Sequence, residues 1–152
     1  MLVGNAILIP LVLNANLWAA ALPPTIFIVG NYLMCKKGVW EEWIGIITYP
    51  ISILLLTILG YTLDPLYLIV PTLILTYGDA LASIVGRLFF KTEQKSMQGS
   101  FVMFTVSIFI CAFFFSVQTA FSIALLCTLI EGSKWDNLTV PLAASGMIFL
   151  LR

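Results

Sequence analysis

The chain has 152 residues, of which 61% are hydrophobic and 9% charged, and its seven Lys or Arg balance seven Asp or Glu. A water-soluble domain usually carries about 25% charged residues, so charge cannot cover this surface and we expect lipid to surround much of it. The balanced charge gives no basic excess for nucleic acid, and the absence of His removes the commonest general base and zinc ligand. The length favours one integral membrane domain over residues 1–152.

The first apolar stretch covers residues 1–34 and has no Lys or Arg before it, which predicts a retained helix and not a signal peptide. Pro23-Pro24 interrupts this stretch. It predicts either two short helices or one spanning helix with an oblique segment. The cysteines of later stretches, Cys111 and Cys127, fit as small packing residues.

Charged residues divide the rest of the chain into pieces near the length of about 20 apolar residues that a membrane span requires. The run 100–130 is too long for one span and slightly short for two, and its polar residues near Ser116 predict a hairpin of two helices. The fold class is therefore all-α, a polytopic transmembrane bundle of about 5–7 helices. The predicted helical pieces after residue 34 are 44–61, with a kink at Pro50, then 66–86, 100–130 and 138–151.

Loop charge predicts the orientation. Lys36 and Lys37 lie in one loop, and Arg87, Lys91 and Lys95 lie in another that is two helices further on. An even number of spans places both loops on one side, and the positive-inside rule makes that side cytoplasmic. The hairpin would return the loop 131–137 to this same face.

Asp79 lies inside an apolar helix, about two turns from the next polar loop. A carboxylate at that depth needs a partner, a water-filled cavity or a cation, which indicates a functional site. Residues 79, 82, 83 and 86 share one helical face and are small or polar. That pattern alone is also typical of a seam where helices approach closely.

Two loops complete the candidate constellation. In the first, residues 91–100, Ser100 is a predicted N-cap of the next helix, and Gly99 would let a ligand approach the backbone, as at an anion site. An ordinary capped helix after a basic loop explains these residues equally well. In the second, Glu131, Asp136 and Asn137 offer oxygen ligands suited to Mg²⁺, although a solvated loop with a helix cap is the simpler alternative.

These motifs, taken in order, resemble the polyprenol, phytol and dolichol kinase family, which is related to the phosphatidate cytidylyltransferases. The pattern is G-D-x-x-A-x-x-x-G-R, then K-S-x-x-G-S before a helix, then E followed by D-N-L-x-x-P-L. The first half of the chain matches only as apolar helices, with a weak echo at Tyr49-Pro50. The matching residues are Gly78, Asp79, Ala82, Gly86, Arg87, Lys95, Ser96, Gly99, Ser100, Glu131, Asp136, Asn137, Leu138, Pro141 and Leu142.

The resemblance implies a membrane enzyme that transfers the γ-phosphate of CTP, or another nucleoside triphosphate, to a lipid alcohol such as phytol or dolichol. Asp79 and Asp136 would be catalytic, with one of them able to take the proton of the lipid hydroxyl. Mg²⁺ would be bound by Asp79, Asp136, Glu131 and Asn137. The phosphates would be bound by Arg87, Lys91, Lys95, Ser96, Gly99 and Ser100.

One departure from the family is clear. Its members commonly have an N-terminal helix with a basic R-K-x-x-H-like segment, which this chain lacks, so we expect a short homologue or a fragment. Two alternatives to the kinase stay open: a cytidylyltransferase that forms a CDP-activated lipid, and a membrane scaffold or small transporter subunit without enzymatic activity. The chain lacks the D-R-x-D ending typical of the cytidylyltransferases, which favours the kinase.

Overall fold

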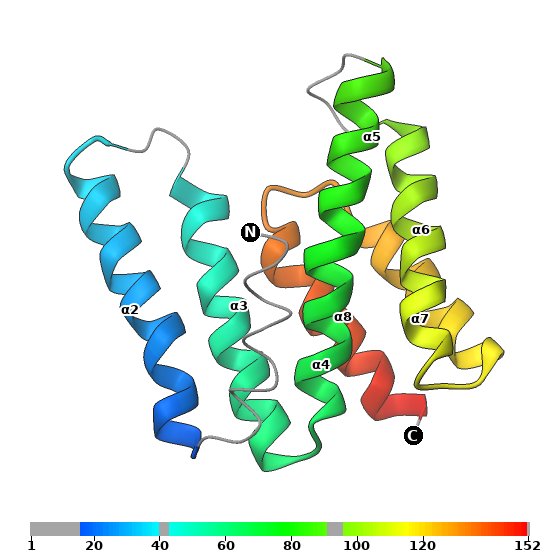
Figure 1. The fold of residues 1–152 in the computed structure, drawn as a ribbon, viewed down its shortest axis with the longest axis horizontal. Helices are drawn as coiled ribbons and strands as arrows, with labels where there is room; N and C mark the ends of the chain where they lie inside the picture. Colours follow the sequence, from blue (N-terminus) through cyan, green and yellow to red (C-terminus); the bar gives the residue numbers. More distant parts are fainter. Residues whose placement is uncertain (1–15, 40–42, 91–95, 152) are drawn as a thin grey trace.

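A computed structural model describes residues 16–39, 43–90 and 96–151, and these residues are helical apart from short connections, with no strand among them. The predicted all-α bundle is therefore confirmed. Because α4, η1 and α5 follow one another without a break, the described part forms six helical rods (Figure 1). The elements are α2 (Leu17–Lys36), α3 (Trp43–Thr62), α4 (Leu66–Leu73), the π-helix η1 (Ile74–Asp79), α5 (Ala80–Phe90), α6 (Met97–Ala112), α7 (Val117–Ile130) and α8 (Asp136–Leu151).

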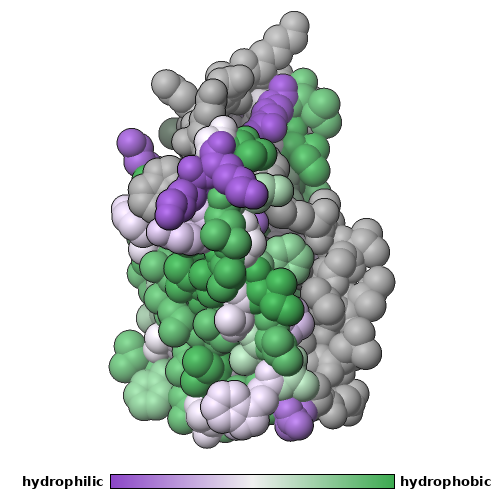
Figure 2. Space-filling model, turned by 90° about the vertical axis from the view of Figure 1, so that its left-hand side faces the viewer, coloured by the Kyte–Doolittle hydropathy of each residue, from purple (hydrophilic) through white to green (hydrophobic). Residues whose placement is uncertain are grey.

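Three of these rods are long and apolar enough to cross a membrane: Leu17–Lys36, Ile44–Thr62 and Leu66–Leu88. Large apolar side chains stay exposed on them, including Phe27, whose relative exposure is 62%. Figure 2 shows this apolar surface on the side where α2 lies, with hydrophilic residues gathered mainly toward one end. Such a surface is unfavourable in water and favourable in lipid, so the chain is a membrane protein.

Helix α2 corrects the prediction of a break at Pro23-Pro24, because it continues through both prolines. Proline has no backbone N–H, but its φ is compatible with a helix, and membrane helices tolerate it more readily than soluble helices do. The helix begins after Asn16, whose side-chain Oδ1 accepts a hydrogen bond from the Ala19 N–H at 2.9 Å. The part of the prediction that covers residues 1–15 lies outside the described residues.

The predicted hairpin within residues 100–130 is confirmed. Helices α6 and α7 pack along each other, and Ser116 caps α7 by accepting a hydrogen bond from the Thr119 N–H at 3.4 Å. Helices α3 and α8 begin and end within about two residues of their predicted limits, a normal uncertainty for helix ends.

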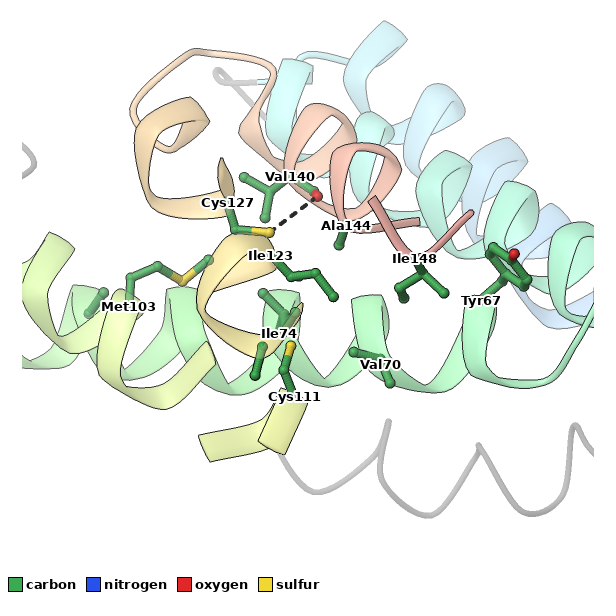
Figure 3. Close-up of a cluster of buried hydrophobic side chains, with 12 residues drawn as sticks. Tyr67, Val70, Ile74, Met103, Cys111, Ile123, Cys127, Val140, Ala144 and Ile148 are labelled. Atoms are coloured by element: carbon green, nitrogen blue, oxygen red, sulfur yellow. Dashed lines mark hydrogen bonds between the residues drawn. The ribbon is translucent and has the colours of Figure 1, made fainter. Parts of the chain in front are cut away.

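Helix α8 joins the two halves of the bundle, since it contacts α3, α4, η1 and α7. Its buried side chains Val140, Ala144 and Ile148 face those of α4 and η1 in Figure 3. Cys111 and Cys127 are fully buried in this same cluster and are not disulfide-bonded, as expected for packing residues. The Cys127 thiol lies 3.9 Å from the Val140 carbonyl oxygen.

The polar segments gather at one end of the bundle. In Figure 1, the C-terminal ends of α2 and α5 and the N-terminal ends of α3, α6 and α8 lie toward the same end. The turns between α3 and α4 and between α6 and α7 lie at the other end. The chain thus brings Lys36, Arg87 and Asp136 to one end, as the sequence predicts.

Glycine allows the closest helix contact in the α3–α4 pair. A Cβ added at Gly60 would lie 2.7 Å from the Leu68 Cβ, which is closer than packed carbons approach. We predict that Gly60→Ala lowers the free energy of unfolding by about 1–3 kcal/mol, because overpacking forces the two helices apart.

Gly146→Ala is the matched control, since no atom lies within 4 Å of the position that its Cβ would take. It should leave stability unchanged or raise it slightly through helix propensity. Thermal unfolding of both variants in the same detergent makes the comparison. Equal stability of the two variants would contradict this account of the α3–α4 contact.

Candidate functional site

Asp79 is the last residue of η1 and lies within the membrane-spanning stretch Leu66–Leu88. Its side chain is half-buried and takes part in interactions within the protein. The predicted carboxylate within an apolar span is therefore confirmed as a feature of the fold. Single turns of π-helix occur frequently at functional sites, where the wider backbone turn re-aims side chains. The sequence did not predict the π-helix.

A seam of small residues runs from this point along α5 and packs against α6. A Cβ at Gly78 would lie 2.5 Å from the Met103 Sδ, and a Cβ at Gly99 would lie 3.2 Å from the Ala82 carbonyl oxygen. Further along, a Cβ at Gly86 would lie 3.5 Å from the Ser96 Oγ. The contacts recur every four residues, so η1 and α5 lie antiparallel to α6 along this seam.

The seam corrects the predicted helical face. Gly78, Ala82 and Gly86 are its buried members, whereas Ser83 is exposed and Asp79 lies only half-buried beside it. The residues that contact α6 are four apart and begin at Gly78, not at Asp79 as predicted. Ser83 is therefore not part of the contact and faces outward. Close helix packing therefore explains the glycines and the alanine of the first motif, and it does not explain the charge of Asp79.

The N-cap of α6 is Ser96, and the prediction of Ser100 is wrong. The Ser96 Oγ accepts a hydrogen bond from the Gly99 N–H at 3.1 Å, and the Ser96 carbonyl oxygen accepts one from the Ser100 N–H at 3.0 Å. Both N–H groups that were expected to hold phosphate are thus already bonded. The first N–H groups of a helix have no intrahelical partner. At the start of α6 these include the N–H groups of Met97 and Gln98, which could bind an anion.

Of the three basic residues of the predicted phosphate site, the structure describes only Arg87. Arg87 is exposed on α5 near the polar end of the bundle. Lys91 and Lys95 lie outside the described residues. In the sequence, both lysines fall between the end of α5 and the start of α6.

Asn137 fixes the start of α8 to α3. Its Nδ2 donates a hydrogen bond to the Gly45 carbonyl oxygen at 3.2 Å, and its own carbonyl oxygen accepts a hydrogen bond from the Ser52 hydroxyl. Ser52 is fully buried. Hydrogen bonds between membrane helices contribute on average about 0.6 kcal/mol each, so their main effect here is to set the position of α8.

The α3 residues Gly45 and Ser52 were missed by the sequence analysis. Hydroxyls spaced along an apolar helix usually bond to their own backbone, as the Thr57 hydroxyl does with the Ile53 carbonyl oxygen at 2.7 Å. Nothing in the sequence distinguishes Ser52 from such residues, because its partner on α8 is 85 residues away along the chain.

Asp136 and Asp79 lie on two elements, α8 and η1, that contact each other. The Ser145 hydroxyl on α8 lies 3.4 Å from the Tyr67 carbonyl oxygen on α4, and Figure 1 shows that α8 runs opposite to the rod that α4 begins. From this contact toward the polar end, α8 leads back to its first residue, Asp136, and η1 leads on to its last residue, Asp79. Both aspartates therefore lie on the polar side of the α4–α8 contact.

The predicted metal ligands do not form a complete cage in the described part of the chain. No group of three or more Cys, Asp or Glu side chains there is close enough to hold a metal ion. Asn137 commits its Nδ2 to Gly45, although its Oδ1 can still accept. Glu131 is half-buried at the end of α7, with one carboxylate oxygen shielded from solvent. Magnesium usually takes one or two carboxylates together with waters and substrate phosphates, so it does not require a complete cage of protein ligands.

Two buried hydroxyls near η1 are unusual. The Thr72 Oγ1 and the Ser107 Oγ are buried without a hydrogen-bond partner among the described residues, whereas most other Ser and Thr hydroxyls here bond to the carbonyl four residues earlier. Ser107 lies beside Gly78, with its Oγ 3.6 Å from the position of an added Cβ. The polar surroundings of η1 thus extend beyond Asp79.

Comparison of the chain with protein-family models, with curated proteins and with solved structures finds no significant match. The candidate site is therefore judged on its own geometry.

The cap of α6 gives a direct prediction. Ser96→Ala should lower the free energy of unfolding by about 1 kcal/mol, because the Gly99 N–H loses its acceptor. Ser100→Ala removes the same hydroxyl one turn later, where it caps nothing, and should change stability little. Chemical unfolding in detergent tests both, and a larger loss for Ser100→Ala would contradict the assigned cap.

Proposed function

We propose that this protein is a membrane kinase that transfers the γ-phosphate of CTP, or of another nucleoside triphosphate, to a lipid alcohol such as phytol or dolichol. The observation that carries the proposal is the half-buried Asp79 carboxylate at the end of a π-helix within a membrane-spanning helix. Its support also includes the three ordered motifs that resemble the polyprenol, phytol and dolichol kinases. A lipid hydroxyl can reach this depth from the bilayer, while a nucleotide approaches from the polar end.

The chemistry asks little covalent help from the protein. Phosphoryl transfer forms a bond between the lipid oxygen and the γ-phosphorus and breaks the bond to the β-phosphate, which leaves CDP. One of Asp79 and Asp136 accepts the proton of the lipid hydroxyl, and the other, with Glu131 or the Asn137 Oδ1, holds the metal. Magnesium, when bound, neutralises charge on the phosphates. Arg87, Lys91 and Lys95 bind phosphate oxygens.

The proposal places the polar end of the bundle at the cytoplasmic face. The residues at that end include Lys36, Lys37 and Arg87, and the positive-inside rule favours the cytoplasm for such segments. CTP is a cytoplasmic metabolite, so this orientation gives it access to the site. Membrane lipids surround the apolar faces of the spanning helices.

Asp79→Asn tests the central residue. The variant should lose at least about 100-fold in rate, because Asn can neither take a proton nor supply a negative charge to the metal. The measurement is transfer of label from γ-labelled CTP to phytol, farnesol or dolichol by purified protein in detergent with Mg²⁺. Full activity of this variant would exclude the assigned role of Asp79.

Asp64→Asn is the matched control. Asp64 lies at the opposite end of the same helix, where its Oδ1 accepts a hydrogen bond from the Leu66 N–H at 2.9 Å, and Asn can keep that bond. This variant should retain wild-type activity.

Label position separates the alternatives: retention of an α-label in the lipid would identify a cytidylyltransferase and contradict the kinase.

Nucleotide binding separates the enzyme from a scaffold or transporter subunit. CTP with Mg²⁺ at a hundredfold excess over its Kd should raise the free energy of unfolding by about 2.7 kcal/mol. Replacing Lys91 and Lys95 by Ala should abolish most of this stabilisation. Replacing Lys36 and Lys37, exposed basic residues at the same end, should not. Absence of any stabilisation in the wild-type protein would favour the scaffold.

A further inference from the structure

Helix α3 reaches the start of α8 through two polar contacts between segments far apart in the chain. The Asn137 Nδ2 donates to the Gly45 carbonyl oxygen at 3.2 Å. The buried Ser52 hydroxyl lies between the carbonyl oxygens of Thr48, at 2.9 Å, and Asn137, and shares its single proton between them. We call Gly45, Ser52 and Asn137 the α3–α8 clamp.

The clamp depends on close approach. A Cβ at Gly45 would lie 3.3 Å from the Asn137 Nδ2, so a larger residue would push against the amide. Thr48, which lies between the two α3 members of the clamp, is also buried, and its hydroxyl bonds to the Ile44 carbonyl oxygen at 2.8 Å. Simple packing of two apolar helices requires none of these polar groups, whereas their directional bonds fix where α8 begins.

The clamp acts next to a candidate catalytic carboxylate. The Asp136 Oδ1 accepts a hydrogen bond from the Asn137 N–H at 2.7 Å, so the residue that α3 holds also orients the Asp136 side chain. One turn further on, the buried Val140 and Pro141 lock α8 into the core. Asp136 comes directly before these two anchors, at the first residue of α8.

We infer that Ser52 and Asn137 are positioning residues, which fix Asp136 at the start of α8 so that it can bind Mg²⁺ with the phosphates of the nucleotide. This inference rests on the proposed kinase function. It assigns to Asn137, whose Nδ2 is bonded to the Gly45 carbonyl oxygen, the orientation of the neighbouring ligand Asp136. Residues that orient metal ligands typically change metal affinity or activity by about 10–100-fold when they are replaced.

The test compares two buried hydroxyls on the same helix. Ser52→Ala removes a hydroxyl that reaches α8, whereas Thr57→Val removes one that bonds only to the Ile53 carbonyl oxygen within α3. Ser52→Ala should lower phosphotransfer about tenfold and raise the half-saturating concentration of Mg²⁺. Thr57→Val should change neither quantity. Ser52→Thr keeps a hydroxyl at this position, so its phosphotransfer rate and its Mg²⁺ requirement should match those of the wild type.

A second measurement does not depend on activity. Hydrogen exchange of the backbone amides of Thr139 and Val140 should be faster in Ser52→Ala than in the wild type, while the amide of Ile148 should be unchanged. Unchanged exchange at Thr139 and Val140 would overturn the clamp. Faster exchange with an unchanged Mg²⁺ requirement would overturn the positioning role. An inactive wild-type protein with faster exchange in Ser52→Ala would overturn the proposed kinase and, with it, the role of the clamp in that reaction, while the contact itself would stand.

Discussion

Lipid cannot drive helices together by the hydrophobic effect, because its tails are as apolar as the side chains that would be buried. This bundle depends instead on contacts that require the absence of a side chain. Gly60 meets Leu68 between α3 and α4, and Gly78 meets Met103 between η1 and α6. The resulting short distances let dispersion forces act over long stretches of helix.

The same constraint decides what polar residues do inside the bundle. A hydroxyl that is exposed to lipid must bond to its own helix, and most here do so. A few hydroxyls depart from this pattern: Ser52 bonds both within α3 and across to Asn137, while Thr72 on α4 and Ser107 on α6 have no hydrogen-bond partner among the described residues. Asp79 lies at the end of η1, which packs against α6. Ser107, which lies beside Gly78, therefore adds a buried polar group next to the motif that carries Asp79.

Packing and chemistry use the motif residues in different ways. Gly78, Ala82 and Gly99 fit the seam between α5 and α6, and Ser96 caps α6. The charged residues have no such use in packing. The proposed function therefore rests on Asp79 and Asp136, together with the basic residues near the connection between α5 and α6. The small residues contribute indirectly, since they bring α6 close to the helix that carries Asp79.

The sequence by itself determined the fold class, most helix limits, the hairpin and the carboxylate within a span, because apolar run length and charge position are local properties. It placed the N-cap of α6 at Ser100 and a break at Pro23-Pro24, and both predictions were wrong. In the first case Ser96 offers the same capping side chain four residues earlier. In the second, the apolar residues on both sides of the prolines favour one continuous helix as much as the prolines favour a break. Only the tertiary structure decided which face of α5 is buried, where the π-helix lies and that Ser52 meets Asn137. These features depend on which helices become neighbours, and contacts over 85 residues leave no mark on local composition.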